Sequence, residues 1–182
     1  MGTDKAFLKV DGRTLLDRAL TLMAAVCDSV TIVGDPAKFA ADRSVVSDIF
    51  PGCGPLAGIH AALAHSTAEL NLMLAVDMPF VSKELLTFLF ATAESDDAIV
   101  TVPRMGKGLQ PLCAVYRRDF LTIAEQALGA QRYKIDAAFS RVSVRVIEKE
   151  ELVAAGFGEQ SFFNINTPQD RLAAEGDLDS RW

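Results

Sequence analysis

The sequence Leu-Asn-Leu-Met-Leu-Ala-Val-Asp-Met-Pro, at residues 70–79, decides the fold. Residues 72–76 are uniformly apolar and as long as a strand, which predicts a strand buried on both faces. Asp77 would then emerge at the carboxyl edge of a parallel sheet, where open α/β folds bind ligands. A carboxylate there can hold a hard cation such as Mg²⁺, which in turn can hold a phosphate. Alternatively, Asp77 caps the following turn or the helix that starts at Ser82.

The composition is that of a small acidic protein with a substantial core. Its 182 residues are 50% hydrophobic, which fits a single domain over residues 1–182. The net charge of −6 argues against nucleic-acid or membrane binding, because both usually require a basic face. The three cysteines are widely spaced and form no CxxC pair, which favours neither a disulfide framework nor a zinc site. Since the first residues also lack a signal-peptide layout, we expect a cytoplasmic protein.

Strand and helix patterns alternate along most of the chain. Strands are predicted over residues 29–34, 45–46, 72–76, 98–102, 112–116, 142–147 and 162–165. Helices are predicted over residues 15–26, 56–64, 83–95 and 119–128, and again after Thr167, with a mobile loop at 104–110. This alternation predicts an α/β fold with a largely parallel sheet covered by helices on both faces.

Two further segments carry groups suited to a nucleotide. Lys5 could neutralise a phosphate as a point charge, or it could be a solvated surface lysine. A base-binding pocket could be lined by Asp48 and the Pro/Gly-rich residues 51–58. A flat base would lie against the backbone there, and the Asp48 carboxylate would pair with the edge of the base. Alternatively, Asp48 closes a turn. Gly54 and Gly58 flank a helix start, which lets backbone N–H groups approach an anion or a base.

The remaining polar candidates are two asparagines and two histidines. Asn164 and Asn166 bracket the last predicted strand and could bind a polar ligand, although Asn166 could also serve helix entry. His60 and His65 are five residues apart, so they diverge on a helix and are interpreted as structural. Cys53 has no neighbour that would activate its thiol and is interpreted as packing.

Five segments in this order resemble one known family nearly from end to end. They are Met-Gly-Thr-Asp-Lys-Ala-Phe-Leu at residues 1–8, Asp48 with Gly-Pro-Leu-Ala-Gly at 54–58, Ala-Val-Asp-Met-Pro at 75–79, Gln-Pro-Leu-Cys-Ala-Val-Tyr at 110–116, and Phe-Asn-Ile-Asn-Thr-Pro at 163–168. The family is that of the MobA-like molybdenum cofactor guanylyltransferases. The resemblance implies a three-layer, Rossmann-like nucleotidyltransferase fold and transfer of GMP from GTP to the terminal phosphate of molybdopterin, with release of pyrophosphate. It also implies Mg²⁺ as cofactor and leaves open a contact with molybdoenzyme-maturation proteins.

The resemblance also assigns roles to individual residues. It places Lys5 on the nucleotide phosphates and Asp77 on Mg²⁺, and it makes these two the catalytic residues. The guanine nucleotide would be held by Asp48 and by Gly54, Pro55, Leu56, Ala57 and Gly58. Asn164 and Asn166 would lie on the molybdopterin side. Because the acceptor phosphate supplies the nucleophile in such a transfer, the absence of a nucleophile–histidine triad agrees with this chemistry.

One part of the family pattern has no counterpart in the 182 residues. In the family, a buried strand and a Leu-Ala-Gly-Gly-x-Ser-x-Arg loop that cradles the triphosphate come before the Met-Gly-x-Asp-Lys segment. We therefore expect a sheet that lacks its first strand, with unpaired backbone between residues 29–34 and 72–77. We also expect weak GTP binding and either low stability or self-association.

The alternative functions share either the predicted fold or the predicted ligand with a guanylyltransferase. A cytidylyltransferase or a sugar-phosphate nucleotidyltransferase would use the same architecture, and base choice depends on a few hydrogen bonds. A non-catalytic module that binds a nucleotide or the cofactor is the alternative outside enzymes.

Overall fold

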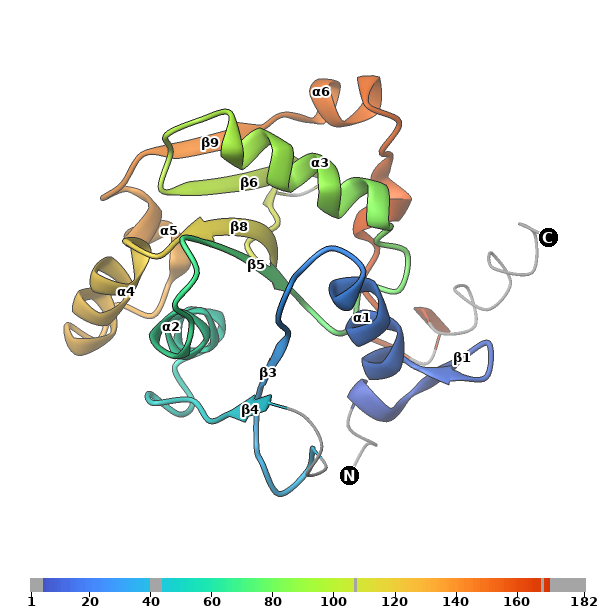
Figure 1. Ribbon diagram of the computed structural model, residues 1–182, viewed down its shortest axis with the longest axis horizontal. Coiled ribbons are helices and arrows are strands. Elements are labelled where there is room, and N and C mark those ends of the chain that lie inside the picture. The colour runs from blue at the N-terminus through green and yellow to red at the C-terminus, as the bar shows by residue number, and fades with distance from the viewer. Residues whose placement is uncertain (1–4, 40–43, 107, 168, 171–182) are drawn as a thin grey trace.

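The computed structural model describes residues 5–39, 44–106, 108–167 and 169–170 (Figure 1). Its α-helices are α1 (Leu15–Ala24), α2 (Pro55–His65), α3 (Lys83–Glu94), α4 (Phe120–Gly129), α5 (Ile135–Phe139) and α6 (Lys149–Ala154). Its strands are β1 (Lys9–Val10), β2 (Arg13–Thr14), β3 (Thr31–Val33), β4 (Ser44–Val46), β5 (Leu70–Leu74), β6 (Val100–Met105), β7 (Gly108–Leu109), β8 (Cys113–Arg117) and β9 (Val144–Ile147). Two 3₁₀ turns, η1 (Lys5–Phe7) and η2 (Glu159–Phe162), complete the elements.

The main sheet has the order β5-β8-β6, with β9 and β7 also paired to β6. β8 is antiparallel to both β5 and β6, whereas β9 is parallel to β6. β5, β6 and β9 therefore run in one direction and β8 runs against them, so the prediction of a largely parallel sheet is only partly met. The reason lies in the connection: β6 turns back through β7 and enters β8 without the crossover helix that a parallel pair requires.

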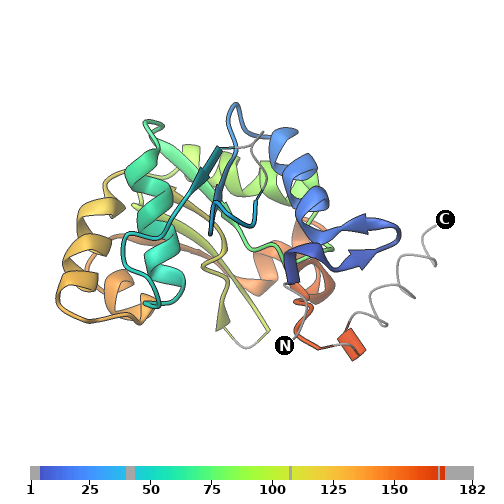
Figure 2. The same cartoon turned by 90° about the horizontal axis from the view of Figure 1, so that it is seen from below.

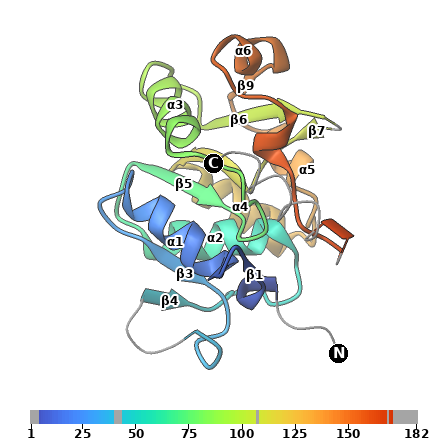
Figure 3. The same ribbon diagram turned by 90° about the vertical axis from the view of Figure 1, so that its right-hand side faces the viewer.

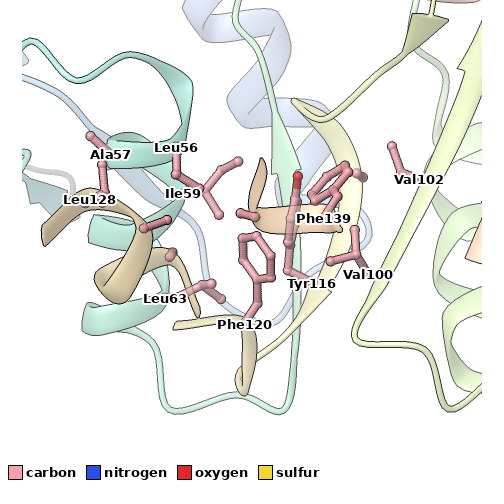
Figure 4. Packing of buried hydrophobic residues seen from close by; sticks show 14 residues of the cluster. Leu56, Ala57, Ile59, Leu63, Val100, Val102, Tyr116, Phe120, Leu128 and Phe139 are labelled. Carbon is pink, nitrogen blue, oxygen red and sulfur yellow. The ribbon is translucent and has the colours of Figure 1, made fainter. Parts of the chain in front are cut away.

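Helices cover both faces of this sheet, which confirms the three-layer prediction (Figure 3). On β8, Ala114 and Tyr116 point to α2, α4 and α5, whereas Cys113 and Val115 point to α3 and α6. Figure 4 shows Tyr116 packed with Phe120 and Phe139, at ring-centroid distances of 5.1 and 6.2 Å. Because β8 is buried on both sides, it is the central strand of the core.

Two helices begin where local side chains predict. The Thr14 hydroxyl accepts the N–H of Asp17 at 3.0 Å and caps α1. The Ser82 hydroxyl accepts the N–H of Leu85 at 3.2 Å and caps α3. Each cap satisfies a backbone donor that has no partner inside the helix. Because Ser82 itself caps α3, Asp77 does not have that role.

Three local predictions were wrong. β6 continues through Pro103 to Met105, because β8 pairs with β6 only at Val100 and Thr101 and so needs no N–H from the proline. Residues 104–110, predicted as a loop, contain the end of β6 and its antiparallel pairing with β7. Residues 162–165 form no strand: η2 ends at Phe162, and the extended backbone beyond it bonds to the turn after β5. The predicted helix after Thr167 lies largely outside the described residues.

β3 and β4 form a separate parallel pair (Figure 1). Within the described residues, β3 has no pairing with β5, and an open cavity of about 1090 Å³ is lined by both strands and by the apolar face of α1. The prediction that β5 is buried on both faces was therefore wrong, since only Leu72 of its five residues is buried. Among the described helices, none combines the length and apolarity needed to span a bilayer.

Candidate functional site

Asp77 lies in the turn that follows β5, where it meets residues from both ends of the described chain. Lys5 Nζ lies 3.4 Å from Asp77 Oδ2 and donates to Asn166 Oδ1 at 2.7 Å. The Lys5 side chain is 42% exposed and that of Asp77 is 22% exposed, so both remain open to a ligand. The ion pair places a candidate phosphate-binding cation next to a candidate metal-binding carboxylate.

Backbone bonds fix the position of this turn. The N–H of Ala75 donates to the carbonyl of Leu112 at 2.7 Å, which extends the β5–β8 ladder beyond the strand. The N–H of Ile165 donates to the carbonyl of Asp77 at 2.9 Å and brings the residues after η2 to the same place (Figure 2). The Asp77 carbonyl is therefore used by the fold, while its carboxylate is available for chemistry.

The glycine-rich segment forms a second group of candidate residues at the start of α2. Gly54 is the N-cap at φ = 75°, a conformation that other residues rarely adopt, and Pro55 follows at the first helical position. Asp48 Oδ1 would lie 3.9 Å from a Cβ atom added to Gly58. Asp48 and the first turn of α2 are thus neighbours, as a base pocket made of one carboxylate and backbone requires.

Leu56 and Ala57 are placed differently from the rest of this segment. Both side chains are fully buried in the core that α2 shares with α4. Cys53 packs against the same core, in agreement with its interpretation as a packing residue. The side chains of Leu56 and Ala57 therefore hold the helix in place, and only their backbone could face a nucleotide.

One cavity connects the two groups of candidate residues. It is lined by Ala6, Asp48, Gly54, Pro55, Gly58 and Asp77, and continues between α1, β3 and β5. Its volume of about 1090 Å³ is slightly above the range of roughly 300–1,000 Å³ that is typical of small-molecule sites. The cavity therefore reaches from the Asp48 end to the Asp77 end.

The structure separates the two asparagines that the sequence groups together. Asn166 bonds to Lys5, as described above, whereas Asn164 Nδ2 donates to the carbonyl of Phe162 at 3.3 Å. Asn164 is half-buried beside η2. Asn166 therefore belongs to the Lys5–Asp77 end of the site.

Asp170 is a residue of this region that sequence reasoning did not single out. Its Oδ2 accepts the N–H groups of Asn166 at 2.9 Å and Thr167 at 2.7 Å. These bonds, followed by the Thr167 hydroxyl and the charge of Lys5, lower the pKa of the Asp170 carboxyl. The Thr-Pro-Gln-Asp spacing was an available signal, but it indicated only a helix start.

The described residues offer no activated nucleophile near Asp77. His60 is buried, with its ring 5.1 Å from that of Phe50, and burial lowers its pKa. His65 lies 3.4 Å from the Ser44 hydroxyl on β4. Burial raises the pKa of the Cys113 thiol to about 12. Within the described ranges no three His, Cys, Asp or Glu residues form a metal cluster, so a cation at Asp77 would complete its coordination with water or ligand oxygens.

Comparison with known proteins gives the family of this chain. Residues 1–145 match the MobA-like NTP transferase domain. The chain is 36% identical over 176 residues to a probable molybdenum cofactor guanylyltransferase of Pelotomaculum thermopropionicum, covering 96% of this chain and 85% of the relative. A molybdenum cofactor guanylyltransferase of Desulfosudis oleivorans is also 36% identical, covering 96% of this chain and 87% of the relative.

Solved structures agree with the architecture. The molybdopterin-guanine dinucleotide biosynthesis protein A of Archaeoglobus fulgidus superposes with a TM-score of 0.85 at 29% identity, covering all of this chain and 93% of that one. The 2-C-methyl-D-erythritol 4-phosphate cytidylyltransferase of Thermus thermophilus superposes with a TM-score of 0.74 at 20% identity, covering 96% and 94% of the two chains, and shares the fold. The chain is thus a nucleotidyltransferase of molybdenum cofactor biosynthesis, and it belongs to the family of MobA-like NTP transferases.

Proposed function

We propose that this protein transfers GMP from GTP to the terminal phosphate of molybdopterin and releases pyrophosphate. The observation that carries the proposal is the single cavity that joins Asp48, Gly54 and Gly58 at one end to Asp77 at the other. A guanine nucleotide placed along it would have its base at the glycine-rich turn and its phosphates near Lys5. The printed names of the relatives, molybdenum cofactor guanylyltransferases, support the choice of substrates.

Base recognition rests on the chemistry of Asp48. An ionised carboxylate only accepts hydrogen bonds, and guanine offers two adjacent donors, its ring N–H and its amino group. Cytosine presents acceptors at the corresponding ring positions and would face the carboxylate unfavourably. Asp48 is exposed at the cavity and lies next to the backbone of α2, so it suits the edge of a purine.

At the other end, Lys5 and Asp77 account for phosphate binding. A single partly exposed carboxylate fits Mg²⁺, which usually binds through one or two carboxylates together with substrate phosphates. When bound, Mg²⁺ would neutralise charge on the phosphates that change their bonding. Lys5 would hold a phosphate oxygen as a point charge, and the acceptor phosphate would provide the attacking oxygen, so no protein nucleophile is needed.

Turnover tests the proposal directly. Purified protein is incubated with GTP, Mg²⁺ and molybdopterin, and pyrophosphate release is measured together with the mass of the dinucleotide product. We expect Asp77→Asn to lower kcat/KM by on the order of 100-fold, because it removes a charge that acts on the reacting phosphates. Asp97→Asn, which changes an exposed aspartate in the connection between α3 and β6, is the control and should retain activity.

Two outcomes would contradict the proposal. Nucleotide binding without pyrophosphate release would indicate a binding module instead of an enzyme. Faster transfer from CTP than from GTP would indicate a cytidylyltransferase. The role of Asp48 is tested separately: Asp48→Asn should reduce the preference for GTP over CTP while Mg²⁺-dependent phosphate binding remains, since the change is confined to the base end of the cavity.

A further inference from the structure

The contact between Lys5 and Asn166 raises the question of what holds Asn166 in place. The Lys5 Nζ–Asn166 Oδ1 distance of 2.7 Å is shorter than the 3.4 Å from Lys5 Nζ to Asp77 Oδ2. Residue 166 is exposed and belongs to no strand, so packing gives its side chain little support. Its backbone N–H, however, bonds to Asp170 Oδ2 at 2.9 Å.

Asp170 accepts one hydrogen bond in addition to those of a helix-capping box. Thr167 Oγ1 accepts the N–H of Asp170 at 3.1 Å, and Asp170 Oδ2 accepts the N–H of Thr167 at 2.7 Å, which is the reciprocal pair of a capping box. The bond from the Asn166 N–H is additional to that pair. It fixes the peptide unit before Asn166 and therefore the direction in which the Asn166 side chain leaves the backbone.

We propose that Asp170 is a positioning residue for Lys5. Its carboxylate orients Asn166, and the Asn166 side-chain oxygen holds the Lys5 ammonium group beside Asp77. The assignment rests on the proposed function of this site. Asn166 then serves the nucleotide end, in contrast to the molybdopterin side expected from the sequence. The bond from the Ile165 N–H to the Asp77 carbonyl at 2.9 Å supports the same arrangement, because it anchors the neighbouring residue to the turn that carries Asp77.

The decisive variants change Asp170 and its capping partner separately. Asp170→Ala removes both carboxylate bonds, whereas Asp170→Asn keeps one side-chain oxygen as an acceptor. Thr167→Ala is the control for the capping box: it removes the Thr167 hydroxyl, which contacts both the N–H and the carboxyl of Asp170, and keeps the two backbone N–H bonds of the carboxylate.

Steady-state kinetics distinguish positioning from a general structural role. We expect Asp170→Ala to lower kcat/KM for GTP by about 10- to 100-fold, the usual effect of removing a group that orients a functional side chain. The KM for molybdopterin should stay unchanged, Asp170→Asn should restore part of the activity, and Thr167→Ala should behave as wild type. A rise confined to the KM for molybdopterin would overturn the proposal, as would an equal loss in Thr167→Ala.

Lysine side-chain NMR provides a readout without substrates. The Lys5 ¹⁵Nζ signal, assigned with Lys5→Arg, should shift towards those of exposed lysines in Asp170→Ala and stay in place in Thr167→Ala. An unchanged Lys5 signal in folded Asp170→Ala would overturn the proposal, whatever the activity. Failure of the proposed function would be seen differently, because the wild-type protein would then transfer no nucleotide. The NMR comparison would still test whether Asp170 positions Lys5.

Discussion

Gly58 lies where α2 faces Asp48, without a side chain between them. Its φ is not in the left-handed region, and an added Cβ would meet Asp48 Oδ1 and Val33 Cγ1 at ordinary contact distances of 3.9 Å. We therefore expect Gly58→Ala to raise the free energy of unfolding by about 0.5–1 kcal/mol, because alanine is preferred inside a helix. The same methyl group narrows the base end of the cavity, so GTP affinity should fall. Urea unfolding and calorimetric titration measure the two effects, and a gain in both would contradict the placement of the base.

His60 makes the stability depend on pH. Burial lowers its pKa from the ordinary 6.5, and the charge of Glu125 opposes this only partly. The unfolded chain therefore binds a proton more readily, and the free energy of unfolding should decrease as the pH falls from 6.5 towards the folded-state pKa. We expect His60→Leu to lose this dependence and His65→Gln, at the exposed end of α2, to retain it. Urea unfolding between about pH 7 and 5 measures it; an equal slope in all three proteins would contradict the assignment.

The two faces of α1 should differ in their contribution to stability. Leu15 is 1% exposed and packs with Val10 and Phe80, whereas Leu20 lines the cavity. Leu15→Ala should cost about 2–5 kcal/mol, the range for a buried leucine. Leu20→Ala should cost clearly less, because part of its surface already faces open space. Chemical denaturation of both variants tests this, and equal losses would mean that the cavity collapses in solution.

Helix starts that depend on a nearby side chain could be predicted from the sequence. The starts of α1 and α3 depend on Thr14 and Ser82, which bond three residues ahead. The reversal of β8 and the continuation of β6 through Pro103 depend on which strands become neighbours, and no local pattern specifies that. Residues 162–165 have a strand-like composition, but no described strand pairs with them, and the Ile165 N–H bonds instead to the turn that carries Asp77.

The sequence predicted which residues are candidates for the site, but it did not predict the contacts among them. The family resemblance assigned Lys5 to the nucleotide phosphates, Asp77 to Mg²⁺ and Asn166 to the molybdopterin side. In the structure the three lie together, although 72 and 161 residues separate Lys5 from the other two. The contact of Asn166 with Lys5 and the two backbone bonds of the Asp170 carboxylate depend on backbone directions that a sequence motif does not encode.

For the whole molecule, the open cavity between β3 and β5 is the dominant feature. Its walls include Leu16, Leu20 and Met23 of α1. Apolar side chains that line an open cavity are accessible to a small apolar probe. We therefore expect the native protein to bind the dye ANS without denaturant, with fluorescence that decreases when Leu20→Asp places a charge on the wall. Dye fluorescence at the level of a close-packed control protein would contradict this expectation.

The backbone bond between Ile165 and Asp77 links the residues after η2 to the turn after β5, at the proposed phosphate end of the site. Its amide hydrogen can exchange with deuterated solvent only when these two segments separate. The exchange rate at this one position therefore reports how often the assembled site comes apart. A bound triphosphate that holds Lys5 and Asp77 together should slow this exchange more than that of amides in the distant α4–α5 connection.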